Sequence, residues 1–362
     1  MKKVAIIGGG ISGLYFANIL NNEKNFEYKI FEKKENYDFQ EGYGIQLSVN
    51  SIKLLNKVGF KNLSASEVNF PSKVNFIQAS NLKKICDIDL TQFNDSLNRY
   101  TTLKRSTLLK FLFQNIPEKK IIFNSNITKI EIADDIRVTF ADRIKQKFDF
   151  LVVSDGIFSK TKSLILSENI YPKYNLNVAL RGKLNGNYGN DISIYMGSNS
   201  HYVIYPMNQN NEYNFIAIIK RKLSSIELTN NDLFKSSEFI SSLVLSLQKT
   251  SQRSFENLSE LKAFPIYVSN SFPSLNKKNM FLAGDALFTF PPSFAQGASQ
   301  SIETANDILK SILSGSNECY EKRIKNISSI NNKSKFNNFS FHLSNPINVF
   351  LRNKILKYLS KN

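Results

Sequence analysis

The sequence has few of the residues that build metal centres and disulfide frameworks. Its 362 residues include no tryptophan, two cysteines and two histidines. Cys86, Cys319, His201 and His342 show neither the spacing of zinc ligands nor the pattern of a disulfide scaffold. We therefore expect no structural metal and no redox-active thiol pair.

Long hydrophobic runs are also absent. No apolar segment approaches the roughly 20 residues that a membrane-spanning helix needs, and the opening sequence MKKVAIIGGG reaches glycines before a signal-peptide core can form. These features predict a mature, cytoplasmic chain. Its length and its hydrophobic content of 42% are typical of a globular protein with two or three structural units.

Acidic residues are outnumbered by basic ones. The chain has 47 Lys and Arg residues against 30 Asp and Glu residues, which gives a formal net charge of +17. A charge of this size suggests a polyanionic partner such as nucleic acid or a membrane surface. The lysines are scattered among Asn and Ile residues and no nucleic-acid-binding motif occurs, so we expect no nucleic-acid partner. A positive field would still attract anionic cofactors and carboxylate substrates.

The first part of the chain has the order of a dinucleotide-binding unit. Over residues 4–20 a β-branched strand leads into Gly8-x-Gly10-x-x-Gly13 and then into an apolar helix. Gly8 permits a tight turn, Gly10 lets the backbone approach a pyrophosphate, and Gly13 lets helix and strand pack closely. A second strand ends at Glu32, at the separation where an acidic side chain meets ribose hydroxyls. Either NAD or FAD suits this fingerprint.

A second unusual segment covers residues 279–309. An apolar strand ends at Gly284-Asp285, Pro291-Pro292 follows, and Gln296-Gly297 opens a helix with one apolar face. A fold alone does not require this sequence, so it indicates a bound ligand.

Five segments in fixed order resemble the single-component (group A) flavoprotein aromatic hydroxylases, of the para-hydroxybenzoate and salicylate hydroxylase type, over nearly the whole chain. They are GGGISGL, EGYGIQLSVNSIKLLNKVG, LKRSTLLKFL, FDFLVVSDGIFSKTKS and LAGDALFTFPPSFAQGASQSIE. The resemblance implies an FAD-dependent monooxygenase with bound FAD, NADH or NADPH as a transient hydride donor, and O2 as the oxidant. It also implies hydroxylation of a phenolic aromatic substrate through a flavin C4a-hydroperoxide.

The resemblance also implies which residues hold the cofactor. Arg105 is expected to contact it, and Asp285 to accept hydrogen bonds from the ribityl chain. The helix at Gly297 would direct its positive end at the anionic pyrimidine side of reduced flavin. After Asp155-Gly156 the family usually carries an arginine, and this chain has Lys160 and Lys162 instead. The expected cofactor-binding residues are Gly8, Gly10, Ile11, Ser12, Gly13, Glu32, Lys33, Gly44, Arg105, Ile127, Asp155, Asp285, Pro292, Gly297 and Ala298.

The region between the DG and GD motifs has short alternating segments separated by Asn and Gly turns, which is typical of an antiparallel sheet. No second GxGxxG occurs, so no separate nicotinamide domain is expected. We predict an α/β fold: a Rossmann-like FAD-binding domain with GxGxxG, DG and GD motifs, an inserted antiparallel β-sheet substrate domain and a helical C-terminal tail. The predicted boundaries are 1–72, 91–172 and 272–317 for the first domain, 73–90 and 173–271 for the second, and 318–362 for the tail.

The stretch HYVIYP supplies the candidate catalytic groups. His201 and Tyr205 point the same way at strand spacing, and salicylate-type members of the family place a catalytic histidine and a tyrosine in a similar stretch. A histidine pKa near 6.5 suits a base that takes a phenolic proton. The alternative is a histidine at a strand edge that is bonded only to the backbone. Gln296, beside the predicted flavin loop, is a third candidate that would orient a substrate hydroxyl.

Three further residues are expected to contact the substrate. Arg181 would pair with a carboxylate, although an arginine on a sheet face is as often structural. Phe215 and Phe290 would form walls of the pocket.

The C-terminal tail is basic and amphipathic. Val349, Ile355, Leu356 and Leu359 form an apolar side, opposed to a basic side that consists of Arg352, Lys354 and Lys357. An apolar stripe usually faces a protein core, but it also suits an anionic membrane surface. The tail therefore keeps one other function open, a flavoprotein reductase, dehydrogenase or hydroxylase acting on a lipid or quinone precursor at a membrane surface. The missing arginine of the DG segment keeps open a second, a non-catalytic flavin-binding protein.

Overall fold

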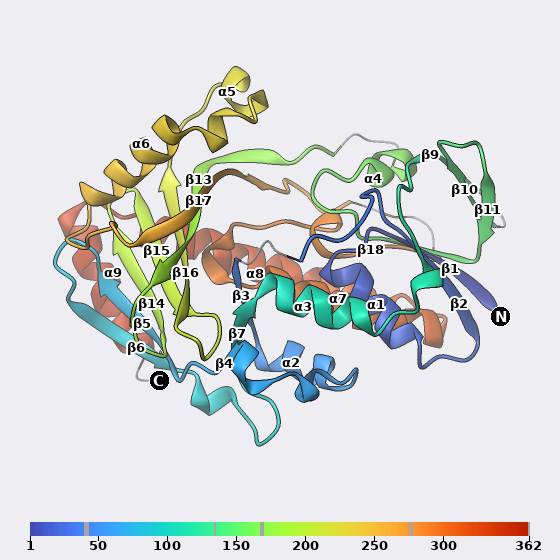
Figure 1. The fold of residues 1–362 in the computed structure, drawn as a ribbon, viewed down its shortest axis with the longest axis horizontal. Helices are drawn as coiled ribbons and strands as arrows, with labels where there is room; N and C mark the ends of the chain where they lie inside the picture. The colour runs from blue at the N-terminus through green and yellow to red at the C-terminus, as the bar shows by residue number, and fades with distance from the viewer. Residues whose placement is uncertain (40–42, 134, 167–169, 274, 276–277, 361–362) are drawn as a thin grey trace.

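The structure, a computed structural model, describes residues 1–39, 43–133, 135–166, 170–273, 275 and 278–360. Figure 1 shows two halves side by side, each built on its own sheet, with the long helix α8 passing behind them. Glu41 and Gly42 of the second sequence segment lie outside the described residues.

The first half is a parallel sheet in the order β18-β12-β1-β2-β8. Its central strands are almost wholly apolar because both faces of the sheet are covered. Helices α1, α3 and α7 pack with these strands into the largest hydrophobic cluster. The predicted Rossmann-like unit is therefore confirmed. Its elements are β1 (Lys2–Ile7), α1 (Ile11–Leu20), β2 (Phe26–Phe31), α3 (Arg105–Gln114), β8 (Ile121–Ile122), β12 (Phe150–Val153), α4 (Lys160–Ile165), β18 (Met280–Leu282) and α7 (Gly297–Ser314).

The second half is a larger sheet in the order β17-β13-β16-β15-β14-β5-β6. Neighbouring strands are antiparallel except β14 and β5, because the β5–β6 hairpin arrives from a distant part of the chain. Helix α6 covers one face of this sheet. The predicted inserted sheet is confirmed, and its elements are β5 (Lys73–Gln78), β6 (Lys84–Asp89), β13 (Lys173–Asn185), β14 (Ile192–Gly197), β15 (Ser200–Pro206), β16 (Glu212–Lys220), α5 (Ser225–Thr229), α6 (Ser237–Gln248) and β17 (Leu258–Val268).

Two small antiparallel sheets complete the first half. One is β3-β7-β4, which lies between the two large sheets, and the other is β11-β10-β9, whose strands pack on the core of the parallel sheet. Their elements, with the helix that follows β3, are β3 (Gly44–Leu47), α2 (Val49–Asn56), β4 (Val68–Asn69), β7 (Thr101–Lys104), β9 (Ile127–Ile132), β10 (Ile136–Phe140) and β11 (Lys145–Phe148).

The two halves meet where β3 and β7 pack against β15 and β16. The Gly44 N–H donates to Asn214 Oδ1 at 2.8 Å, and the Thr102 hydroxyl donates to Pro206 O at 2.6 Å. A Cβ atom on Gly44 would lie 2.6 Å from Asn214 Cβ and 2.7 Å from Tyr205 Cε2. Only glycine therefore permits this approach of the two sheets.

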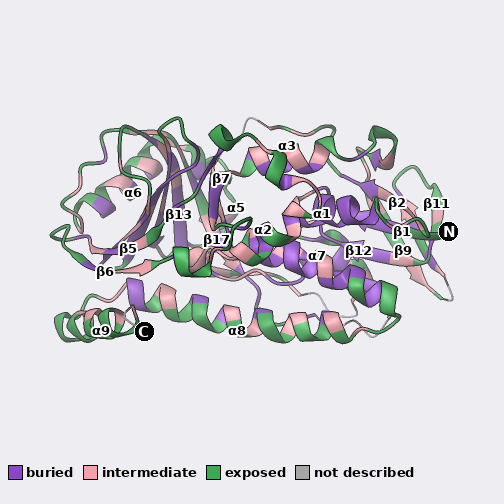
Figure 2. Ribbon diagram, turned by 90° about the horizontal axis from the view of Figure 1, so that it is seen from below, coloured by how far each residue is buried: buried purple, intermediate pink, exposed green. Residues whose placement is uncertain are grey.

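Helix α8 (Glu318–Phe341) fastens the tail to the first half. The Tyr320 hydroxyl donates to Leu282 O at 2.9 Å and accepts from Leu282 N–H at 3.1 Å. Arg323 pairs with Glu303 at 2.5 Å and with Asp307 at 2.8 Å, both on α7. Figure 2 shows α8 running along both halves with an exposed outer side. The predicted helical tail is confirmed.

Helix α9 (Pro346–Leu359) packs against β6 in an unexpected orientation. Arg352 is only 5% exposed, and its guanidinium donates to Gln78 Oε1 at 3.0 Å and to Ser340 O at 3.2 Å. Ile355 and Leu359 are exposed instead. The expectation that the apolar stripe faces the core is wrong for these two residues, because Arg352 finds buried acceptors on the inner side. Among the described residues, no helix combines the length and the hydrophobicity of a membrane span.

We expect Tyr320→Phe to lower the free energy of unfolding by about 1–3 kcal/mol, because the buried N–H and C=O groups of Leu282 lose their partner. Urea unfolding of the apoprotein measures this change. Tyr171→Phe is the matched control, since Tyr171 is 68% exposed. Equal unfolding midpoints for wild type and Tyr320→Phe would contradict this role of Tyr320.

Candidate active site

In the glycine turn after β1, Gly8 and Gly13 are packed too closely for a side chain. Gly8 has φ +95°, and a Cβ atom there would lie 2.6 Å from Ser154 O. A Cβ atom on Gly13 would lie 2.1 Å from Gly8 O. Gly10 is the N-cap of α1 and supplies no side-chain hydrogen bond, so the first N–H groups of this helix stay available to an anion.

Glu32 lies directly beside this turn. Its carboxylate accepts from Gly9 N–H at 2.7 Å and from Lys34 N–H at 3.0 Å. The Tyr37 hydroxyl donates to Gly9 O at 2.9 Å. Burial, and next the charge of Glu32, raise the pKa of Tyr37, so it acts as a neutral donor. Lys33 is exposed next to Glu32.

The DG segment places a half-buried carboxylate, Asp155, and a buried lysine, Lys162, on the other side of Gly8. Asp155 Oδ1 is buried without a hydrogen-bond partner in the described part of the chain. Lys162 is 3% exposed; burial lowers its pKa, and the charge of Asp155 acts in the opposite direction. Lys162 therefore supplies a buried positive charge where the resembled family usually has an arginine, whereas Lys160 is exposed.

The GD turn brings the N-termini of two helices together. Gly284 has φ +59°, and its Cβ position lies 3.3 Å from Ser12 Cβ on α1 and 3.2 Å from Ser301 Oγ on α7. The Ser12 hydroxyl also donates to Ser301 O at 3.1 Å. The N-cap of α7, Gln296, makes no side-chain cap bond, and no atom lies within 4 Å of a Cβ on Gly297. The first turns of α1 and α7, neither of which has a side-chain N-cap bond, therefore lie side by side at Gly284.

Asp285 lines a cleft at this point. Asp285 is exposed, yet the surrounding protein atoms raise the pKa of its carboxyl group, and the charge of Arg105 acts in the opposite direction. Both properties hold together only for a side chain in a recess. Asp285 and the positively charged Arg105 are therefore close enough to interact electrostatically.

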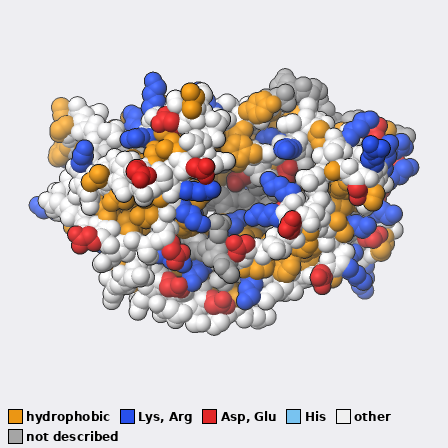
Figure 3. Space-filling view, turned by 45° about the horizontal axis from the view of Figure 1, so that its top comes forward, with side chains coloured by type: hydrophobic (Ala, Val, Ile, Leu, Met, Phe, Trp, Pro, Cys, Tyr) orange, Lys and Arg blue, Asp and Glu red, His pale blue; other side chains and the backbone are white. Residues whose placement is uncertain are grey.

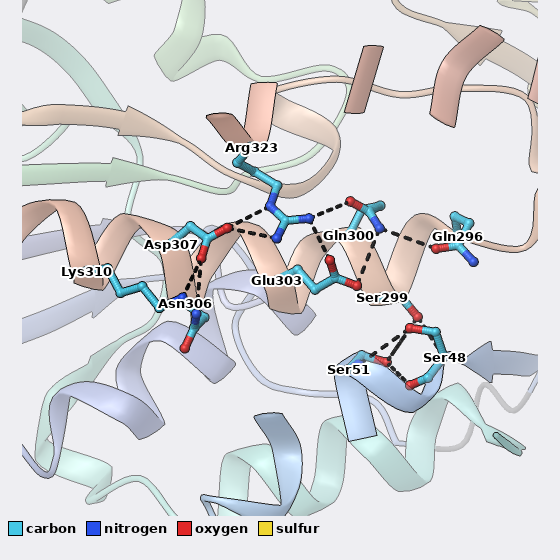
Figure 4. A network of polar contacts seen from close by, with 10 residues as sticks. All are labelled: Ser48, Ser51, Gln296, Ser299, Gln300, Glu303, Asn306, Asp307, Lys310 and Arg323. Carbon is cyan, nitrogen blue, oxygen red and sulfur yellow. Dashed lines mark hydrogen bonds and ion pairs between the residues drawn. The ribbon is translucent and has the colours of Figure 1, made fainter. Parts of the chain in front are cut away.

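A polar network holds the start of α7 in place (Figure 4). Ser299 Oγ accepts from Ser48 N–H at 3.0 Å and lies 3.1 Å from Ser51 Oγ, which joins α7 to α2. On the other side of α7, Gln300 donates to Gln296 Oε1 at 3.3 Å and accepts from Arg323 at 3.2 Å.

The loop before α7 is held by α8. The Ser334 hydroxyl donates to Pro291 O, and the Ser293 hydroxyl donates to Asn338 Oδ1 at 3.1 Å. Phe290 and Gly297 line a small cavity with Asp285, and Pro292 and Ala298 are half-buried in the same segment. The tail thus fixes the loop that carries several of the expected cofactor contacts.

The second sheet contributes a cation, Arg181, near Tyr43 of the first half. Arg181 on β13 lies with its guanidinium 5.4 Å from the ring centroid of Tyr43. Burial lowers the pKa of Arg181, and Tyr205 and Tyr43 act in the opposite direction. No acidic side chain of the described residues forms an ion pair with Arg181. Figure 3 shows a hollow near the middle of the molecule with Lys and Arg side chains around it.

Three further polar side chains surround Arg181 and Tyr205. The Tyr100 hydroxyl donates to Gln46 Oε1 at 2.9 Å, and burial raises the pKa values of both tyrosines. Asn214 is 1% exposed and its Nδ2 has no hydrogen-bond partner among the described residues. These groups are donors at neutral pH, and none of them is a carboxylate.

The register of the second sheet corrects one predicted substrate contact. Arg181 pairs with Ile216, so Phe215 points to the opposite face. There Phe215 is fully buried against Tyr202 and Phe255, in the cluster under α6. Phe215 therefore does not share the surface of Arg181, because one step along a strand reverses the side-chain direction.

His201 has a partner that the sequence did not reveal. It pairs with Ile218 in register, which puts it on the same face as Tyr205. Its Nδ1 lies 2.8 Å from His342 Nε2 at the end of α8, and its ring packs edge-on against Phe341. His201 is 2% exposed, and burial and then His342 hold its pKa well below the usual range. A neutral, enclosed imidazole bonded to a second imidazole is poorly placed to take a substrate proton.

Other predicted residues lie as follows. Ile11 begins α1, Gly44 begins β3, and Ile127 begins β9, where it packs on the main core. The sequence analysis missed Tyr37, Tyr43, Gln46, Tyr100 and Asn214. Their only sequence signal is position, since Tyr43 and Gln46 fall within a matched segment, and the others follow no spacing rule.

The chain matches the family described as "FAD binding domain" over residues 1–318, and it belongs to that family. It is thus an FAD-binding flavoprotein, and its relatives are monooxygenases.

Two curated relatives cover most of the chain. The 6-hydroxynicotinate 3-monooxygenase of Bordetella bronchiseptica is 21% identical over 84% of this chain and 80% of its own length. The 3-amino-4-hydroxybenzoate 2-monooxygenase PtmB3 of Streptomyces platensis is 21% identical over 97% of this chain and 91% of its own length. The chain is therefore an oxidoreductase of the FAD-dependent aromatic monooxygenase type.

Solved structures share the fold. Klebsiella pneumoniae HpxO, complexed with FAD and uric acid, has a TM-score of 0.80 at 16% identity, over 99% of this chain and 93% of that one. A salicylate hydroxylase substrate complex has a TM-score of 0.76 at 16% identity, with the same two shares.

We expect Asp285→Asn to lower FAD affinity ten- to a hundredfold, about 1.5–3 kcal/mol, because a charged hydrogen-bond acceptor is lost. The apoprotein should melt at the same temperature or higher, since the raised pKa of Asp285 shows that burial disfavours its charged form. FAD titration and apoprotein melting on one preparation measure both effects. Asp232→Asn, at an exposed site, is the control. A lower melting temperature with unchanged FAD affinity would assign Asp285 to the turn instead.

Proposed function

We propose that this flavoprotein uses NADH or NADPH and O2 to hydroxylate an electron-rich aromatic or heteroaromatic ring that carries an anionic oxygen. The observation that carries the proposal is Arg181, a half-buried cation at the junction of the two halves, with no acidic ion-pair partner among the described side chains. A charge that is partly shielded from water and lacks a counter-ion is costly, so an anionic ligand group would be stabilised there.

The relatives support this choice of substrate class. The relatives include a 6-hydroxynicotinate 3-monooxygenase and a 3-amino-4-hydroxybenzoate 2-monooxygenase, and the similar structures include a complex with uric acid and a salicylate hydroxylase. Each compound combines a ring with an acidic group. We assign the acidic group of the unknown substrate to Arg181 and its ring to the space beside Tyr43 and Phe290.

The residues of the first half fit FAD. Gly8 and Gly13 have no room for side chains, Asp155 offers an unsatisfied acceptor among the described residues, and neither α1 nor α7 has a side-chain cap at its N-terminus. Glu32 would hold the adenosine ribose, Asp285 the ribityl chain, and the α7 N-terminus the pyrimidine side of the flavin. Bound FAD supplies the oxygen activation, and the protein supplies position and environment.

In this proposal the substrate binds as its phenolate, with its phenolic proton released to water, so no histidine base is needed. A positive charge in a buried site lowers the pKa of a nearby phenol, so Arg181 favours the phenolate form of the ring. Tyr205 stays protonated because burial raises its pKa, although Arg181 acts in the opposite direction. Its hydroxyl would donate to the anionic oxygen. Gln296 and the surrounding loop would exclude water from the other side of the ring.

One observation favours a second candidate, a hydroxylase or reductase of a lipid or quinone precursor at a membrane surface. Helix α9 turns apolar side chains outward. Activity with hydroxylated aromatic acids in the absence of lipid would separate the first candidate from the second.

Arg181→Met should raise KM for an accepted aromatic acid by about 10- to 150-fold, as expected from losing a charged hydrogen-bonded pair of about 1.5–3 kcal/mol. The measurement is NAD(P)H oxidation coupled to hydroxylated product, with a panel that includes the compounds named above. Arg181→Lys should recover part of the loss, since it keeps the charge but not the planar fork. An unchanged KM for every accepted substrate in Arg181→Met would refute the anion-binding role.

His201→Ala should leave kcat within about threefold of wild type, whereas loss of a general base costs a hundredfold or more. It should instead lower stability, since the buried pair with His342 is broken. Burial lowers the pKa of His342 from 6.5 to about 4, so the wild-type free energy of unfolding should fall as the pH drops from about 6.5 to 4. This fall should be smaller in His342→Ala. A hundredfold loss of kcat with normal FAD content would restore His201 as the base.

A further inference from the structure

Helix α9 carries large apolar side chains that are more than half exposed in the described part of the chain. Six large side chains on it are between 51% and 69% exposed, namely Ile347, Phe350, Leu351, Ile355, Tyr358 and Leu359. Their spacing of three, four and seven residues puts most of them on one side of the helix. We call these six residues the α9 face.

The inward side of α9 shows that this orientation is specific. Arg352 is buried and donates to Gln78 and Ser340, and Leu356 packs near Phe76 and Phe341. Rotating the helix to bury the α9 face would break these hydrogen bonds and leave the Arg352 guanidinium without its acceptors. The helix is therefore fixed with its apolar side outward. A group of neighbouring exposed apolar side chains of this kind often marks an interaction site.

The charges around the α9 face select the partner. Lys354 and Lys357 lie exposed among the apolar side chains, with Lys354 Nζ 4.7 Å from the Phe350 ring centroid, and residues 344–360 contain no acid. On the adjoining strand β6, Asp87 is paired with Lys84 and Lys73. A second copy of the same face would bring like charges together, and a nucleic acid offers nothing to six apolar side chains.

We propose that the α9 face docks the enzyme on an anionic lipid bilayer, with α9 parallel to the surface. Apolar side chains enter the boundary of the acyl chains while the lysines meet the anionic headgroups. The overall charge of +17 draws the protein toward such a surface. This docking is independent of the substrate assigned to Arg181.

The chain offers a clean optical test because it contains no tryptophan. Phe350→Trp would be the single indole of the holoenzyme, and its emission should shift to the blue when vesicles with about 30% phosphatidylglycerol are added. Vesicles of phosphatidylcholine alone should give no shift. Phe93→Trp is the matched control, since Phe93 and Phe350 are 58% and 57% exposed.

Vesicle flotation of the FAD-loaded protein gives the second measurement. Ile355→Glu with Tyr358→Glu should reduce bound protein at least tenfold, and so should Lys354→Glu with Lys357→Glu. The controls with equal charge change are Ile226→Glu with Leu245→Glu and Lys222→Glu with Lys249→Glu, on exposed positions outside α9. Flavin absorbance and melting temperature confirm that each variant is folded, and raised salt should weaken binding.

Three results would overturn the proposal. The first is no blue shift and no flotation of the wild-type background with anionic vesicles. The second is an equal loss of binding in the control variants. The third is a wild-type dimer, detected by light scattering, that Ile355→Glu converts to a monomer, because the α9 face would then be an interface between copies.

Discussion

The approach of β3 to the second sheet at Gly44 is the constraint on which the two-part site depends. Any side chain at Gly44 would collide with Asn214 and Tyr205, so the two halves can meet only where this residue is glycine. The contact joins the strand after the flavin loop to the strands that carry the polar substrate groups. It therefore sets how closely the first half approaches Tyr205 and Asn214 of the second sheet.

The C-terminal helices complete the site although they contribute no expected cofactor contact. Arg323 binds Glu303 and Asp307 on α7, and α8 also holds the loop at Pro291. Because these bonds are largely shielded from water, their geometry is more restrictive than that of a surface pair. Helix α8 thus orients the N-terminus of α7, while α9 keeps its apolar side free.

The electrostatics of the cleft divide by location. The first half supplies helix N-termini, Asp155 and Asp285, which suit phosphates and hydroxyls. The second half supplies Arg181 with neutral tyrosines, because burial raises their pKa values. The site thus combines one fixed cation with donors that stay protonated at neutral pH. Under the proposed function, this arrangement would bind an acidic ring without a histidine base, and His201 would serve only its contact with His342.

Local sequence determined the elements of the first half, since Gly8, Gly13 and Gly284 are required by backbone conformation or close packing. Alternation likewise determined that the middle segment is a sheet. Only the tertiary structure decided which face of that sheet meets the cleft, and so placed Arg181 there and Phe215 away from it. Only the tertiary structure paired His201 with His342 and turned Arg352 inward, because these contacts join residues 141 and 274 positions apart. Such partners leave no local pattern, since hydrogen bonding and burial depend on the completed packing and not on spacing along the chain.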